Sequence, residues 1–175
     1  MSTRSIIMTK QEDKYVGVYA HFDGYPSYRI PLLLKYHNSQ EAADAIVALG
    51  SISSLKPYIA PADGVKHSFD SPAEHVTIAY NRDRGEDLDV ATADTRDELV
   101  DQEWSYCFED GQWWFRCSYR NAQWESAQEW FDKATEGTGL TIDDYTLLWT
   151  SIKEKAPQGF VAIQDAISKY EEDNE

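Results

Sequence analysis

The sequence has little of what characterises secreted and membrane proteins. Only two of its 175 residues are cysteines, and no apolar run approaches the length of a membrane span. The first residues, MSTRSIIMTKQEDK, lack the positive and then apolar segments of a signal peptide. We therefore expect a cytoplasmic protein that is long enough to be stabilised by a hydrophobic core rather than by disulfides.

Signatures of common enzymes and cofactor sites are also missing. The sequence contains no Walker or dinucleotide-binding glycine pattern and no HExxH or CxxC metal motif. His67, His75, Asp70 and Glu74 lie close together in the sequence, but such residues are common in polar loops. We predict neither a metal nor a cofactor, assign no catalytic residue, and favour a protein that is not an enzyme.

Basic residues are scarce relative to acidic ones. The chain has 16 Lys and Arg against 31 Asp and Glu, which gives a formal net charge of −15. Residues 1–87 hold 11 acidic and 9 basic residues, whereas residues 88–175 hold 20 and 7. Nucleic-acid binding needs clustered basic residues, and anionic membranes would repel this chain. We predict a partner protein with a basic surface; the oligomeric state does not follow from the sequence.

A β-hairpin is predicted at residues 104–119, WSYCFEDGQWWFRCSY. Asp-Gly at 110–111 between two aromatic runs is typical of a two-residue type I′ turn, which pairs Glu109 with Gln112. The residues on one face are then Trp104, Tyr106, Phe108, Trp113, Phe115 and Cys117. Cys107 points to the other face, so the two cysteines cannot form a disulfide. Neither is expected to be a nucleophile, because no base lies near.

The N-terminal half shows strand-like and helical patterns. Residues 3–9 and 14–22 predict two strands joined by a polar turn. A short helix is predicted at 27–37, where Pro31 fits only in the first turn. The next helix is predicted to begin with Asn38 and Glu41 as a capping box and to stop at Gly50. Residues 51–75 are interpreted as a long loop, 76–80 as a strand and NRDRGED (81–87) as a polar turn.

The C-terminal third is dominated by helical patterns. An acidic segment that ends at Asp101 contains at most one helix, and after the hairpin the predicted helices lie at 122–134, 141–156 and 159–172. This order predicts an α+β fold over residues 1–121, an antiparallel sheet with two helices packed on one face. Residues 122–175 are predicted to form a helical C-terminal appendage.

Several short blocks resemble a known group of proteins. The blocks are STRS, HFDGYP, ALGSISSL, HSFDSP, AYNRDRGE and FEDGQWW, and they span roughly 120 residues in a consistent order. Together they resemble a family of small, mostly uncharacterised proteins encoded by bacteriophages, prophages and plasmids. The resemblance implies expression inside an infected or carrier bacterium but implies no chemistry, and it does not extend beyond residue 121.

The stretch HFDGYP (21–26) is open to two interpretations. His21 and Asp23 are suited to acid–base chemistry or ligand binding. A turn needs the same pattern, with Asp23 bonding its own backbone and Gly24 at positive φ, and we favour the turn. Arg82 and Arg84 are suited to binding a phosphate or carboxylate, although salt bridges to neighbouring acids are the simpler explanation.

The strongest hypothesis rests on the acidic half of the chain. Between residues 86 and 110 ten carboxylates accompany the single base Arg96. Solubility alone is one explanation, and a surface that presents carboxylates to a basic cleft, as DNA presents phosphates, is another. We predict a phage or mobile-element protein that binds and inhibits a host protein of a defence or DNA-processing system.

Two sets of residues follow from these hypotheses. The predicted partner-binding residues are Glu86, Asp87, Asp89, Asp94, Asp97, Glu98, Asp101, Glu125, Glu129 and Asp132. We expect Asp94 with Asp97 and Glu98, and Glu125 with Glu129 and Asp132, to share helix faces. The alternative is a small enzyme or an anion- or nucleotide-binding protein whose pocket is formed by Tyr19, His21, Asp23, Arg82 and Arg84.

Overall fold

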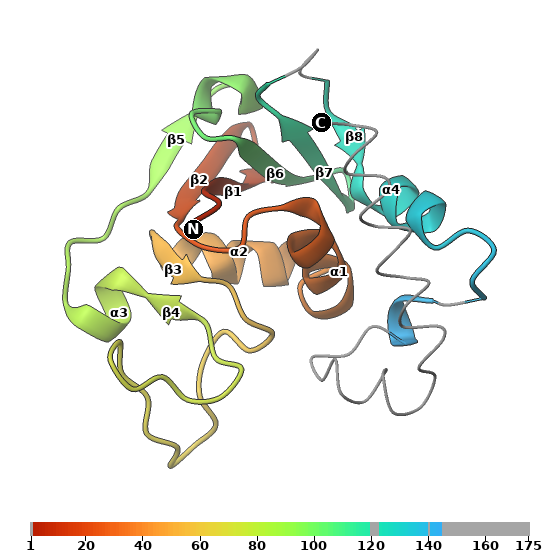
Figure 1. The fold of residues 1–175 in the computed structure, drawn as a ribbon. Helices are drawn as coiled ribbons and strands as arrows, with labels where there is room; N and C mark the ends of the chain where they lie inside the picture. The colour runs from red at the N-terminus through yellow and green to blue at the C-terminus, as the bar shows by residue number, and fades with distance from the viewer. Residues whose placement is uncertain (1, 120–122, 140, 145–175) are drawn as a thin grey trace.

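The computed structural model describes residues 2–119, 123–139 and 141–144 (Figure 1). The fold is α+β, as predicted. The strands are β1 (Ser5–Gln11), β2 (Lys14–Ala20), β3 (Ile52–Ser54), β4 (Ile78–Ala79), β5 (Ala91–Ala93), β6 (Trp104–Glu109), β7 (Gln112–Cys117) and β8 (Glu125–Ser126). The helices are α1 (Pro26–Tyr36), α2 (Gln40–Ala48), α3 (Tyr80–Arg84) and α4 (Ala127–Ala134), with 3-10 turns η1 (Arg96–Leu99) and η2 (Ile142–Asp144).

The aromatic hairpin of β6 and β7 is confirmed in detail. Glu109 pairs with Gln112, and both turn residues take positive φ, 54° at Asp110 and 78° at Gly111. The side chains of Tyr106, Phe108, Trp113 and Phe115 are buried in the main core, whereas Cys107 belongs to a separate cluster on the opposite face. The two cysteines are free.

The sheet is mixed, which corrects the prediction of an antiparallel sheet. Its strands run in the order β4-β3-β2-β1-β6-β7-β8, and β5, which is outside this order, pairs with β2. The pairs β1–β6 and β2–β3 are parallel. Parallel pairs need long crossover connections, and the chain provides them: α1 and α2 lie between β2 and β3. Pairing of β1 with a strand almost a hundred residues later cannot be inferred from local periodicity.

The first two helices form where predicted, with different starting residues. α1 begins with Pro26 at its first position, so Pro31 lies in the second turn and removes one helical hydrogen bond, contrary to the expected first-turn position. α2 is capped by Ser39, whose Oγ accepts the Ala42 N–H at 3.1 Å, rather than by Asn38. Gly50 follows α2 with φ 73°, as expected for a stop signal.

Several short elements differ from the predictions. The expected long loop contains β3, and the expected turn at NRDRGED begins as the helix α3, which ends where Gly85 takes φ 74°. The acidic segment contains β5 and η1, and the predicted helix from 122 is replaced by β8 followed by α4. Elements of two to five residues carry too few periodic positions to be recognised from sequence.

Within the described residues, an apolar cluster lies on each face of the sheet. The main cluster, on the face that we call the inner face, joins strand residues such as Ile7 and Val18 with residues of α1, α2 and α4. Figure 1 shows α2 beside β1 and β2, α1 between α2 and α4, and α4 next to β8. The second cluster consists of Ile6, Met8, Leu99 and Cys107. Leu99 therefore fixes the acidic segment to the face of the sheet that we call the outer face.

Most of the predicted C-terminal appendage lies outside the described residues. The helix predicted at 159–172 lies wholly outside them, and of the helix predicted at 141–156 only residues 141–144 are described. In the described part, β8 pairs with β7, and Trp130 and Phe131 of α4 are buried in the main cluster. The beginning of the second segment thus packs against the first. A boundary at residue 121 stays a prediction.

Candidate functional site

Residues 86–103, which we call the acidic strap, cross the outer face of the sheet. The strap is attached at several places, among them β5, where Ala91 and Ala93 pair with Gly17 and Tyr15 of β2, and η1, where Leu99 is buried. Strand pairing and an apolar anchor fix the backbone, so the carboxylates between them project from a defined path. The strap is therefore a rigidly held acidic surface.

Every carboxylate predicted for partner binding is exposed. In the strap these are Glu86, Asp87, Asp89, Asp94, Asp97, Glu98 and Asp101. The three later ones, Glu125, Glu129 and Asp132, are exposed as well. Exposure alone does not separate a binding surface from a solubilising one, so the partners of each carboxylate matter.

Three strap carboxylates are paired with basic residues. Glu86 accepts a hydrogen bond from Arg84 at 2.6 Å, and Asp94 pairs with Lys14. Asp97 accepts from the indole of Trp124 at 2.7 Å and from Arg116 at 2.8 Å. The Trp124 hydrogen bond and the Arg116 charge lower the pKa of Asp97. A uniform array of free, phosphate-like charges is therefore not formed.

Two further carboxylates have local roles. Glu98 Oε2 accepts from the Thr95 N–H at 2.8 Å and closes a capping box. Asp89 Oδ2 accepts from Ser51 Oγ at 3.1 Å. In the described part of the chain, Asp87 and Asp101 form no hydrogen bond or ion pair. Among the predicted residues of the strap, these two and the second oxygen of Asp89 are the acidic groups most available to a partner.

The predicted helix faces of like charge are wrong in part. η1 begins at Arg96, so Asp94 lies before it, and Glu125 lies in β8 rather than on a helix. Glu129 and Asp132 do share α4. The spacing of Glu125, Glu129 and Asp132 predicted a shared helix face, but the pairing of β8 with β7 determines the conformation at Glu125.

HFDGYP is a turn, as favoured, but for a different reason. The left-handed residue is Asp23, with φ 57°, and Gly24 is not left-handed, contrary to the prediction. A Cβ at Gly24 would lie 2.7 Å from Ser5 Cβ. His21 Nδ1 lies 2.6 Å from Tyr19 Oη. The predicted pair His21 and Asp23 therefore belongs to a closely packed turn beside β1.

A buried arginine that sequence reasoning missed holds this turn. Arg29 is fully buried, and its Nη2 donates to the carbonyls of Phe22 (3.2 Å) and Asp23 (3.4 Å). Tyr106 Oη donates to the Gly24 carbonyl at 2.6 Å, and its ring lies 5.6 Å from the Arg29 guanidinium. Burial lowers the pKa of Arg29. The only signal in the sequence is one arginine in the otherwise apolar helix SYRIPLLL.

The two arginines of the alternative pocket already pair with other groups of the protein. Arg82 donates to Asp83 at 2.8 Å and to the Thr77 carbonyl at 2.7 Å. Arg84 pairs with Glu86 and lies 4.1 Å from the centre of the Phe69 ring. These are the local salt bridges favoured from the sequence, and an anion would have to compete with them.

His67 and Asp83 form a buried hydrogen-bonded pair that sequence reasoning also missed. His67 Nδ1 accepts the Ala73 N–H at 2.9 Å, so its Nε2 carries the proton donated to Asp83 Oδ2 at 3.0 Å. Burial would raise the pKa of Asp83, but hydrogen bonds from Arg82, the Ala79 N–H and His67 lower it to about 2. Both ring nitrogens are used, so His67 is neither a base nor a free ligand.

The metal and nucleophile candidates are dispersed. His75 lies 3.1 Å from Glu74 rather than beside His67. Within residues 2–119, 123–139 and 141–144, no three His, Cys, Asp or Glu side chains are grouped so that they could hold a metal ion. Burial raises the pKa of Cys107 to about 12, which keeps its thiol protonated and unreactive.

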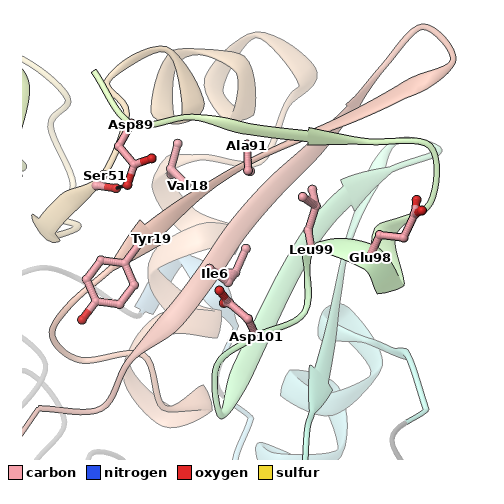
Figure 2. A pocket seen from close by; sticks show the side chains of 10 residues that line it. Ile6, Val18, Tyr19, Ser51, Asp89, Ala91, Glu98, Leu99 and Asp101 are labelled. Carbon is pink, nitrogen blue, oxygen red and sulfur yellow. Dashed lines mark hydrogen bonds between the residues drawn. The ribbon is translucent and has the colours of Figure 1, made fainter. Parts of the chain in front are cut away.

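A cavity lies between the acidic strap and the sheet. Its volume is about 220 Å³, and Figure 2 shows its lining side chains. They are contributed by β1, β2, β5 and η1, together with Ser51, Asp89 and Asp101. The pocket predicted around His21 and Arg82 does not coincide with it; of that set only Tyr19 lines the cavity.

Comparison with protein-family models, with curated proteins and with solved structures finds no match for this chain. In the described residues, no helix is long and apolar enough to cross a membrane. The site must therefore be interpreted from its own geometry.

Proposed function

We propose that this protein binds and inhibits a host protein with a basic surface, in a bacterium that carries a phage or mobile element. The observation that carries the proposal is the acidic strap: eight exposed carboxylates, the seven predicted ones and Glu103, on a segment fixed to the sheet by β5 and Leu99. A preformed surface loses little conformational entropy on binding. A host enzyme that processes DNA, or one that acts in defence, offers the basic cleft that such a surface fits.

Apolar side chains within the strap favour protein binding over simple solubility. Leu88 and Val90 are 57% and 37% exposed, and they alternate with Asp87 and Asp89. Protein interfaces combine an apolar centre with a polar rim, whereas solubility needs no exposed leucine. Local pairing of Glu86, Asp94 and Asp97 makes a strict copy of DNA phosphates less favoured than an ordinary acidic interface.

The two faces of the sheet have different roles in this proposal. In this proposal, helices cover the inner face and stabilise the protein, and the outer face with its strap is left for the partner. Residues 122–175 would add a helical appendage to the same body. The alternative enzyme or nucleotide binder is not favoured, because Arg82 and Arg84 are already paired.

The test begins with the immobilised full chain and bacterial lysate, from which captured proteins are identified and purified for kinetics. A strap variant with amides at Glu86, Asp87, Asp94 and Asp101 is compared with a control variant with amides at Glu41, Asp63, Asp70 and Glu74. Both sets change the net charge equally. We expect the strap variant to associate on the order of tenfold more slowly, and salt to slow the wild type similarly.

Two results would contradict the proposal. One is a partner whose binding is independent of salt. The other is an equal loss of association in the strap and control variants, because net charge rather than the strap would then explain the binding. Competition by duplex DNA for the captured partner would show that the strap occupies a DNA-binding cleft.

A further inference from the structure

The cavity beneath the acidic strap has an apolar floor. Ile6 of β1, Gly17 of β2 and Leu99 of η1 line it, and Ala91 of β5 lines its upper side (Figure 2). A Cβ at Gly17 would lie 3.2 Å from Leu99 Cδ1, so the absence of a side chain there lets Leu99 pack closely against the sheet beside the cavity. The apolar lining of the cavity suits contact with an aliphatic chain that lies along the outer face of the sheet.

Carboxylates stand on more than one side of this floor. Figure 2 shows Asp101 next to Ile6, and Asp89 at the other end of the cavity beside Ser51. Asp89 uses Oδ2 to accept from Ser51, and Asp101 forms no hydrogen bond or ion pair with the rest of the described chain. Glu98 also lines the cavity, although its Oε2 is held by Thr95. The rim thus offers negative charge beside an apolar surface.

The size of the cavity limits its occupant. At about 220 Å³ it is smaller than the ~300–1,000 Å³ typical of sites for drug-sized ligands, so it suits one side chain rather than a nucleotide. A long aliphatic stem that ends in a cation matches an apolar floor with an acidic rim. On the basis of the protein-binding function above, we propose that this cavity receives one lysine side chain of the partner protein.

Lysine fits better than arginine for a geometric reason. An ammonium group is a compact charge at the end of a flexible four-carbon stem, so a lysine can lay its stem on the floor and place its charge at Asp101. A guanidinium group is wider and planar and ends a shorter apolar stem, so it makes less use of a small apolar cavity. The lysine stem would pack against Ile6 and Leu99, and its ammonium group would lie beside the carboxylate of Asp101.

The test uses the labelled full chain and three short peptides. Acetyl-Gly-Lys-Gly-amide is titrated while the methyl signals of Ile6 and Leu99 and the amide signals of Gly17 and Ala91 are followed by NMR. The same peptide with norleucine keeps the stem and removes the charge, and one with arginine changes the head group. We expect saturable shifts at the cavity in the millimolar range for lysine, and weaker binding for the other two.

Variants separate the cavity from the general charge of the strap. Asp101→Asn removes the rim carboxylate, and Asp87→Asn removes an exposed strap carboxylate that does not line the cavity. We expect Asp101→Asn to weaken binding of the lysine peptide about three- to tenfold and Asp87→Asn less than twofold. Ala91→Leu, at an exposed position of β5, should block the cavity and abolish the shifts.

Three outcomes would overturn the lysine site: no shifts with the lysine peptide, equal effects of Asp101→Asn and Asp87→Asn, or tighter binding of the arginine or norleucine peptide. If the captured partner still depends on the strap in those cases, the proposed function stands and only the cavity assignment fails. If peptide binding is as expected but the partner ignores the strap variant, the proposed function fails instead.

Discussion

Gly24 shows how a single residue can be required by packing rather than by backbone conformation. Its amide donates to the Thr3 carbonyl at 2.8 Å, which holds the turn against the start of β1. A Cβ would lie 2.8 Å from that carbonyl oxygen and 2.7 Å from Ser5 Cβ. Both neighbours belong to the backbone or to the short, buried side chain of Ser5, so neither can move away cheaply.

We therefore expect Gly24→Ala to destabilise the protein more than His21→Ala. Overpacking of this kind costs about 1–3 kcal/mol. His21 is only half-buried, and its loss removes one hydrogen bond to Tyr19, worth about 1 kcal/mol. Urea unfolding of both variants measures the difference. Equal stability of Gly24→Ala and the wild type would show that the turn can separate from β1.

His37 gives a pH dependence of stability. Burial lowers its pKa from 6.5 to about 4, although its Nε2 donates to the Lys56 carbonyl at 2.9 Å. Between these values the unfolded chain binds more protons than the native protein. The free energy of unfolding is therefore unaffected by protonation of His37 above pH 6.5. It decreases as the pH falls from 6.5 to about 4, by roughly 3 kcal/mol in total.

The control for this pH effect is His37→Gln, which keeps a donor near the Lys56 carbonyl but does not titrate. Unfolding free energies of both proteins are measured from pH 7 to pH 4. We expect the wild type to lose stability more steeply, since other groups titrate equally in both. Parallel curves would mean that protonated His37 is tolerated in the core.

At the scale of elements, the aromatic hairpin is the main support of the inner face. Phe115 is 3% exposed and meets Trp130 of α4 edge to face, with ring centroids 6.5 Å apart. Phe115→Ala should cost about 3–5 kcal/mol, whereas Tyr119→Ala, at a residue that is 68% exposed, should cost below about 0.5 kcal/mol. Thermal or urea unfolding distinguishes the two. Similar losses would contradict the role of β7 as a core strand.

At the scale of the whole molecule, charge is the dominant feature. A net charge of −15, with most of the excess after residue 87, opposes the compact state by self-repulsion. We expect the melting temperature to rise as NaCl is raised from 0.01 to 0.5 M, because the Debye length falls below the spacing between charges. The amide variant at Glu86, Asp87, Asp94 and Asp101 should show a smaller rise. An unchanged salt response would indicate that local ion pairs already cancel the repulsion.

The sequence by itself determined the features that depend on neighbouring residues. Asp-Gly between aromatic runs specifies the hairpin, its register and the opposite faces of Cys107 and Cys117. Gly50 ends α2, and Arg82 and Arg84 pair with nearby acids. The acidic character of the strap and the exposure of its carboxylates follow equally from composition. Each depends on contacts within a few residues, which a pattern can capture.

Tertiary structure alone decided which distant segments meet. The parallel pairing of β1 with β6, the requirement for Gly24 beside Ser5 and the burial of Arg29 under Tyr106 all join residues far apart in the chain. The cavity likewise exists only because the strap, which begins some seventy residues after Gly17 in the sequence, lies across Ile6 and Gly17. Local periodicity records which side of an element is apolar but not what covers it, so the candidate site became visible only once the sheet was assembled.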